Sequence, residues 1–153
     1  MATWAELESS APEIASAGRE LLKGGDGHAF LSTVRGDQPP RIHPISVRIV
    51  NGALYAIMLP SAKLTDLLED GRYALHSQLD PDAPSEFLVR GRVREVTDRQ
   101  ERDPVAADWP FRPGEEDRLF ALDIESALLG ERPDANTWPP RYSRWPASGR
   151  GTA

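Results

Sequence analysis

Apolar and polar residues alternate along the segment from residue 41 to residue 50. Every second position from His43 to Ile49 lies on one face, and the positions between them lie on the other. Asn51-Gly52 follows, a pair typical of two-residue hairpin turns, and residues 53–59 supply a return strand. The pattern predicts an antiparallel hairpin whose two faces meet different surroundings.

Apolar residues recur at helical spacing in two places. Residues 11–22 predict one helix, which Lys23 and the glycines after it should end. Ser61 is suited to cap a second helix, whose leucines lie three and four residues apart and which Gly71 should end. A third, short helix is predicted over residues 98–107.

Four further strands complete the pattern. They are predicted at residues 28–34, 73–78, 86–97 and 118–129. Six strands joined mostly by hairpins, with one helix inserted after the third, predict a mainly β fold built as a small antiparallel barrel. Residues 1–146 are expected to form a single domain, and residues 147–153 a disordered tail.

Composition narrows the classes of function. The net charge of −6 argues against nucleic acid as a partner, and the arginines at positions 90, 92 and 94 are expected to form a strand face that meets solvent or nearby acids. The chain has no cysteine, so disulfides and thiolate metal sites are excluded. It has no signal-peptide pattern at its start and no run of about 20 apolar residues. A cytoplasmic location without membrane contact is expected.

Lys63 is the most informative charged residue. It is one of two lysines among eighteen basic residues, and it lies in the first turn of the helix that Ser61 caps. A lysine there opposes the helix dipole unless an anion is bound, whereas helix N-termini favour phosphate groups. We therefore expect contact with a phosphorylated cofactor; the alternative is a solvated lysine beside an ordinary N-cap.

Other candidate chemistry is sparse. The three histidines, His28, His43 and His76, have no spacing typical of a metal site, so no metal is expected, although one of them could ligate haem. Trp138 and the aromatic residues after it either pack the C-terminus or wall a ligand pocket. Catalytic triads, Walker loops and dinucleotide-binding glycine motifs are absent, so no catalytic residue is assigned.

Five short motifs follow one another in the order of a known family. Ser32-Thr33-Val34 corresponds to its first strand, His43 takes the place of its second-strand arginine, and Arg48 that of its lysine. Ser61-Ala62-Lys63 matches an S-x-K motif after the hairpin, and Asp70-Gly71-Arg72 stands in place of N-P-R. In these motifs the chain resembles the pyridoxamine 5′-phosphate oxidase-like, FMN-binding split-barrel family.

The resemblance covers about residues 28–97 and extends more loosely to residue 129. It implies a six-stranded antiparallel split β-barrel with a few flanking short helices, and a homodimer with FMN at its interface. The phosphate would lie near Arg48, Ser61 and Lys63, and the flavin ring across the second and third strands. The cofactor-binding residues that it implies are Thr33, His43, Pro44, Ile45, Ser46, Arg48, Ser61, Lys63, Trp138 and Arg141.

The resemblance thus predicts an FMN-binding oxidoreductase that acts on a small substrate, with hydride chemistry supplied by the cofactor. Two alternatives remain open. One is a reductase that uses the deazaflavin F420, whose acidic tail would need a basic groove; the candidates are Arg41, Arg72, Arg141 and Arg144. The other is a non-catalytic module that binds flavin or haem. Oxidation of vitamin B6 itself is not expected, because the arginine–glutamine pair of the fifth strand is absent.

Overall fold

The computed structural model describes residues 1–24 and 26–147. Of the segment for which disorder was predicted, only Ala147 lies within the described residues. The described residues form seven strands, which are β1 (His28–Thr33), β2 (Arg41–Val50), β3 (Ala53–Met58), β4 (Arg72–Ser77), β5 (Glu86–Glu95), β6 (Arg118–Glu131) and β7 (Arg141–Trp145). The first six confirm the strands predicted from the sequence. The seventh lies in the Pro-, Trp- and Arg-rich region for which no strand was predicted.

Four helices accompany the strands over the same residues, namely α1 (Trp4–Ser10), α2 (Pro12–Gly24), α3 (Ala62–Glu69) and α4 (Arg99–Asp108). The last three confirm predicted helices. The first was not predicted, although it begins with a clear signal. Thr3 and Glu6 form a capping box, in which each side chain accepts a hydrogen bond from the other residue's backbone N–H.

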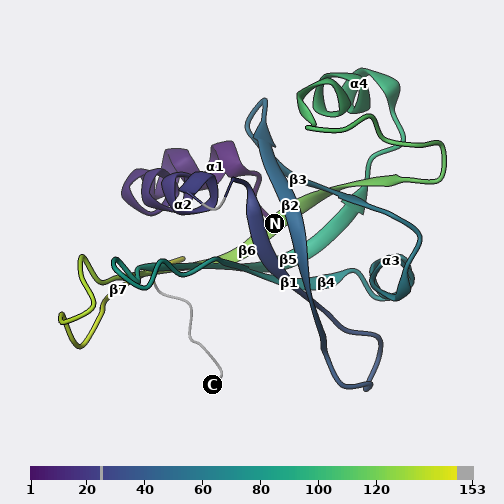
Figure 1. The fold of residues 1–153 in the computed structure, drawn as a ribbon. Helices are drawn as coiled ribbons and strands as arrows, with labels where there is room; N and C mark the ends of the chain where they lie inside the picture. Colours follow the sequence, from purple (N-terminus) through teal and green to yellow (C-terminus); the bar gives the residue numbers. More distant parts are fainter. Residues whose placement is uncertain (25, 148–153) are drawn as a thin grey trace.

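The strands form one antiparallel sheet that closes on itself (Figure 1). Their order is β3-β2-β1-β4-β5-β6-β7, and β3 also pairs with β6, with Tyr55 opposite Ala121. Six strands therefore complete a barrel, and β7 extends β6 outside it. The hairpin between β2 and β3 turns at Asn51 and Gly52, which both have positive φ as a tight hairpin turn requires. The predicted mainly β barrel fold is confirmed.

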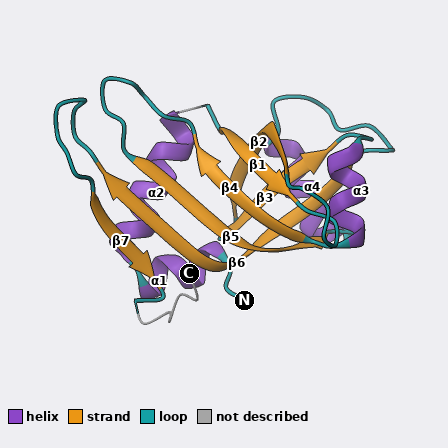
Figure 2. Cartoon of the chain, turned by 90° about the horizontal axis from the view of Figure 1, so that it is seen from below, coloured by secondary structure: helices purple, strands orange, loops and turns teal. Residues whose placement is uncertain are grey.

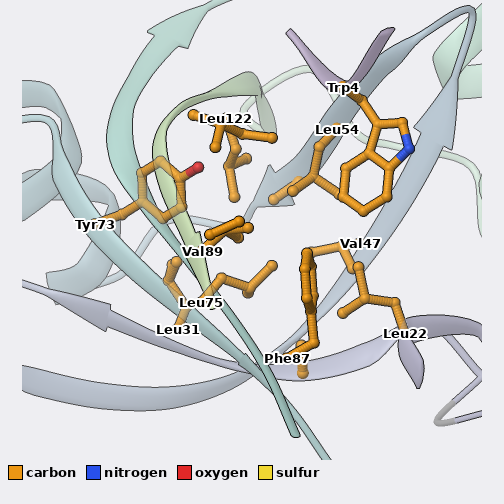
Figure 3. Close-up of a cluster of buried hydrophobic side chains, with 14 of the residues drawn as sticks. Trp4, Leu22, Leu31, Val47, Leu54, Tyr73, Leu75, Phe87, Val89 and Leu122 are labelled. Carbon is orange, nitrogen blue, oxygen red and sulfur yellow. The ribbon is translucent and has the colours of Figure 1, made fainter. Parts of the chain in front are cut away.

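The main core fills the inside of the sheet and is covered by α1 and α2. Trp4 of α1 and Phe87 of β5 are fully buried and pack edge to face, with ring centroids 5.8 Å apart. Leu31, Leu75 and Leu122 from neighbouring strands join them (Figure 3). Burial of each such side chain contributes about 1.5–3 kcal/mol to stability.

A smaller core lies outside the barrel, between α4 and the pair β3–β6. Tyr55 and Ile57 project outward from β3 against Val105 and Trp109 at the end of α4. The opposite face of β1, β4 and β5 carries no helix within the described residues, as Figure 2 shows from below. One outer face of the barrel is therefore covered and the other is open.

The arginines of β5 have the surroundings predicted for them. Arg94 forms an ion pair with Glu101 of α4, Arg92 donates to the backbone oxygen of Asp70, and Arg90 donates to the hydroxyl of Ser126. This face of β5 is thus bonded to neighbouring protein groups.

Candidate functional site

A cavity of about 340 Å³ lies where the open face of β1 and β2 meets the start of α3. We call it the Lys63 cavity. Its walls come from four segments far apart in the chain: β1–β2, the end of β3, the first turn of α3 and the loop after α4. The lining residues are His28, Pro44, Ile45, Ser46, Ile57, Leu59, Lys63, Trp109 and Phe111. Four residues predicted to bind the cofactor are thereby brought together: Pro44, Ile45, Ser46 and Lys63.

The α3 end of the cavity is suited to an anion. The side chain of Ser61 accepts a hydrogen bond from the N–H of Leu64, as an N-cap does, and its hydroxyl donates to the backbone oxygen of Leu59. The first turn of α3 contains no acidic residue, so the charge of Lys63 and the free N–H groups of that turn both attract an anion. The predicted N-cap at Ser61 is confirmed.

The remaining walls are mostly apolar and aromatic. Trp109 is 6% exposed, and Phe111 projects more freely at 45% exposed. His28 Nδ1 and Ser46 Oγ lie 3.3 Å apart and form a hydrogen bond across β1 and β2. Three of the lining residues, His28, Trp109 and Phe111, were not predicted from the sequence to bind FMN. Trp109 and Phe111 could have been found from the sequence, because two aromatic residues close together are unusual in an otherwise irregular region.

His43 and Thr33 are not among the residues that line the cavity. Thr33 is fully buried, and its hydroxyl donates to Asp66 Oδ2 at 2.8 Å. Arg41 Nε lies 3.1 Å from the same oxygen. Burial lowers the pKa of His43, and the positive charges of Lys63 and Arg41 lower it further, so its imidazole is neutral at neutral pH.

Arg48 is not brought to the Lys63 cavity. Its guanidinium lies over the ring of Trp109, 5.5 Å from the ring centroid, and lines a different cavity. Nη1 donates to the backbone oxygen of Val47 at 2.8 Å. Trp109 therefore contacts Arg48 and also lines the Lys63 cavity, and the two basic residues do not converge on one anion in this structure.

The strand β7 lies at the end of the sheet opposite α3 (Figures 1 and 2); Arg141 is its first residue, and Trp138 lies three residues before it in the chain. Trp138 is 73% exposed and stacks under the guanidinium of Arg132, whose carbon is 5.2 Å from the ring centroid. Arg141 forms an ion pair with Glu131 at 2.7 Å. These two residues cannot line the Lys63 cavity of their own chain.

The described part of the chain contains no group of three or more histidine and acidic side chains that could hold a metal ion. The three histidines are dispersed: His28 lines the Lys63 cavity, His43 lies near α3, and His76 pairs with Glu86. Within the same residues, no helix has both the length and the apolar character needed to cross a membrane.

A closed six-stranded antiparallel barrel, with a helix between its third and fourth strands, is a split barrel. It is the fold of pyridoxamine 5′-phosphate oxidase-like proteins, so the resemblance predicted from the sequence is confirmed at the level of the fold. The sequence itself matches no family model and no curated protein.

Three solved structures illustrate the likeness. A candidate pyridoxamine 5′-phosphate oxidase from Listeria innocua has a TM-score of 0.63 at 13% identity, over 76% of this chain and 98% of that one. PhzG from Burkholderia lata 383, solved with tetrahydrophenazine-1-carboxylic acid, has a TM-score of 0.63 at 12% identity, over 90% and 89%. A heme binding protein from Mycobacterium smegmatis has a TM-score of 0.63 at 14% identity, over 86% of this chain and 58% of that one.

Proposed function

We propose that the protein is an FMN-binding oxidoreductase that holds its cofactor in the Lys63 cavity. The observation that carries the proposal is the position of Lys63, which combines with the first turn of α3 at the end of a cavity whose other walls are apolar. A flavin mononucleotide has the matching chemistry, because a dianionic phosphate is joined to a flat, largely apolar ring. The split-barrel fold shared with a candidate pyridoxamine 5′-phosphate oxidase supports the choice.

The residues present fit this cofactor. Lys63 and the N–H groups of the α3 first turn would bind the phosphate, and Ser61 would orient that turn through its cap. Pro44, Ile45 and Ser46 would lie along the ring, with Trp109 excluding water from the far side. The bound flavin would supply hydride transfer, while the protein binds, orients and shields it.

We further propose that two copies of the chain complete the site. Pro44, which lines the Lys63 cavity, pairs across β1 and β2 with Phe30, which is 42% exposed, and Ile42 two residues before Pro44 is 71% exposed. A volume of about 340 Å³ is at the small end for a ligand pocket, as expected if a second chain closes it. Trp138 and Arg141, at the other end of the sheet, would then contribute to the partner's site.

Replacement of Lys63 tests the cofactor proposal. Lys63→Gln should weaken FMN binding by about 1.5–3 kcal/mol, the usual contribution of a hydrogen bond to a charged group. The measurement is calorimetric titration of the apoprotein with FMN. Lys23→Gln, which removes the chain's other lysine, a residue that does not line this cavity, is the control and should leave the affinity unchanged. Equal affinity in the wild type and the Lys63 variant would contradict the proposed phosphate site.

Haem binding is a second candidate, because one observation favours it. His28 lines the same cavity, and its single hydrogen bond to Ser46 uses Nδ1, which leaves Nε2 available as an axial ligand within the described residues. The heme binding protein among the structural relatives has the same fold. The absorption spectrum separates the candidates: a flavin band supports the first and a Soret band, lost in His28→Ala, supports the second.

Nothing comparable favours F420. Of the four arginines that were candidates for a basic groove, three already form ion pairs: Arg41 with Asp66, Arg72 with Asp70, and Arg141 with Glu131. An acidic cofactor tail would have to displace these carboxylates.

A further inference from the structure

A second and larger cavity, of about 470 Å³, lies beside Arg48. We call it the Arg48 cavity. It is bounded by the last turns of α2, the turn that precedes β1, the C-terminal part of β2 and the end of α4. Leu22, Val47 and Ile49 supply an apolar lining, and the rim is charged. The proposed cofactor function makes no use of this cavity.

Arg48 is held rigidly at its wall. Nη1 donates to the backbone oxygens of Val47 at 2.8 Å and Asp26 at 3.4 Å, and the guanidinium stacks on Trp109. Gly27 makes room for it: a Cβ at this position would lie 2.0 Å from Nη1. The Arg48 guanidinium makes two hydrogen bonds with residues 1–24 and 26–147, and both use Nη1. Its Nε and Nη2 are therefore left for a ligand, on a cation that is already held in place.

The other charges define which ligand suits the cavity. Lys23 lies on the rim in the last turn of α2, and no acid in the described part of the chain forms an ion pair with it. Arg19 also lies there but is already paired with Glu8 at 3.3 Å. Asp26 and Asp108 complete the rim and would repel a dianion more than a monoanion. Counted over all the lining residues, three cations face two carboxylates, and the net charge of +1 matches a ligand with a single negative charge.

We propose that the Arg48 cavity binds a small organic monoanion, in which a carboxylate contacts Arg48 and Lys23 and an apolar body lies on Leu22 and Val47. A carboxylate matches the forked geometry of a guanidinium, and the apolar lining gives a reason for preferring an organic acid to an inorganic ion. Trp109 lies between this site and the Lys63 cavity, so the two sites are neighbours with separate ligands.

Four probes test the charge and the apolar body separately. Hexanoate, hexanol and hexylammonium share one alkyl chain and differ in charge, and inorganic phosphate has charge without the chain. Calorimetric titration of the full chain should show saturable binding of hexanoate, and binding of the other three that is weaker by about tenfold or more. Equal affinities for hexanol and hexanoate, or a preference for hexylammonium or phosphate, would overturn the proposal.

Two variants locate the bound hexanoate. Lys23→Gln, an exposed change that should not affect folding, is expected to weaken hexanoate binding about tenfold, and Arg48→Gln at least as much. Lys63→Gln is the matched control from the other cavity and should leave hexanoate binding unchanged. If Lys23→Gln has no effect, the assignment to this cavity is wrong. Because hexanoate binding is measured without flavin, its failure and that of the proposed cofactor site are distinguishable.

Discussion

At Gly27 the backbone has a φ of +74°, a conformation that side chains with a Cβ rarely adopt. The same residue touches the guanidinium of Arg48, and its backbone oxygen accepts a hydrogen bond from the N–H of Val47 at 2.7 Å. One glycine therefore joins the turn after α2 to the middle of β2 and determines where Arg48 can lie.

Replacement of this glycine should lower the stability of the protein for two reasons, which a control variant can separate. Gly27→Ala should lower the free energy of unfolding by about 1–3 kcal/mol, through backbone strain and through clashes of the added Cβ with Arg48 and with the backbone oxygen of Val47. Gly36→Ala has the same kind of strain, with φ of +57°, but its added Cβ would meet nothing within 4 Å. Urea denaturation of the two variants measures the difference; equal losses would show that the contact with Arg48 is unimportant.

Some residues of the candidate site could be predicted from the sequence, and others could not. Ser61 and Lys63 were found because capping and the helix dipole act over one turn of helix, so neighbouring residues in the sequence are sufficient. The separation of Arg48 from Lys63 could not be found in this way. It depends on Trp109 and Gly27, which are remote from both residues in the chain and from each other.

Among the elements, α4 is attached to the barrel by a polar network as well as by apolar contacts. The hydroxyl of Tyr55 in β3 donates to Glu101 at 3.0 Å, and Glu101 also accepts two hydrogen bonds from Arg94 of β5. Burial raises the pKa of Tyr55 to about 12, together with the hydrogen bond to Glu101 and the charge of that carboxylate. The network positions the helix that ends at Trp109.

Tyr55→Phe should therefore lower the free energy of unfolding by about 1–2 kcal/mol at neutral pH. Tyr142→Phe is the control: Tyr142 is 50% exposed, so its loss should change stability by less than about 0.5 kcal/mol. Thermal or urea denaturation measures both. The same cost in the two variants would mean that the hydrogen bond to Glu101 adds nothing.

The stability difference between the wild type and Tyr55→Phe should change with pH in one direction. Because the folded pKa of Tyr55 lies above that of a free tyrosine, its contribution is fully present below about pH 10 and is lost as the pH rises toward about 12. The stability gap between wild type and Tyr55→Phe should narrow across this range. A gap that widens would contradict the raised pKa.

Two elements, α1 and β7, were not predicted from the sequence, for different reasons. The capping box of α1 was present at Thr3 and Glu6, but the helix has only seven residues and a weak periodic signal. The strand β7 has no internal signal strong enough to outweigh the prolines around it. It forms because β6 continues beyond the barrel and offers a free edge, on which Ala127 pairs with Trp145.

For the whole molecule, the main asymmetry is that only one outer face of the barrel is covered. The α4 side buries Tyr55 and Trp109, whereas Phe30 and Ile42 remain exposed on the opposite face. Phe30 lies opposite Pro44, a residue of the Lys63 cavity, so this open face and the proposed cofactor site are continuous.

Ile42→Asp should consequently convert the proposed dimer to a monomer and weaken flavin binding with it. Since Ile42 is 71% exposed, the change should alter the stability of a single chain by less than about 0.5 kcal/mol. Leu68→Asp, at 50% exposed on α3, is the control for an added charge at an exposed apolar position. Sedimentation velocity gives the oligomeric state; an unchanged mass for Ile42→Asp would contradict the proposed interface.

The sequence by itself determined the six strands of the barrel, the hairpin at Asn51-Gly52, and the capped helix that carries Lys63. These features follow from period-two alternation, turn chemistry and helix capping, which act between residues a few positions apart. Only the tertiary structure decided that Trp109 lines the Lys63 cavity, that Arg48 turns to a second cavity, and that one face of the barrel stays open. Each of these depends on which distant segments pack together, and local sequence does not encode side-chain direction across such contacts.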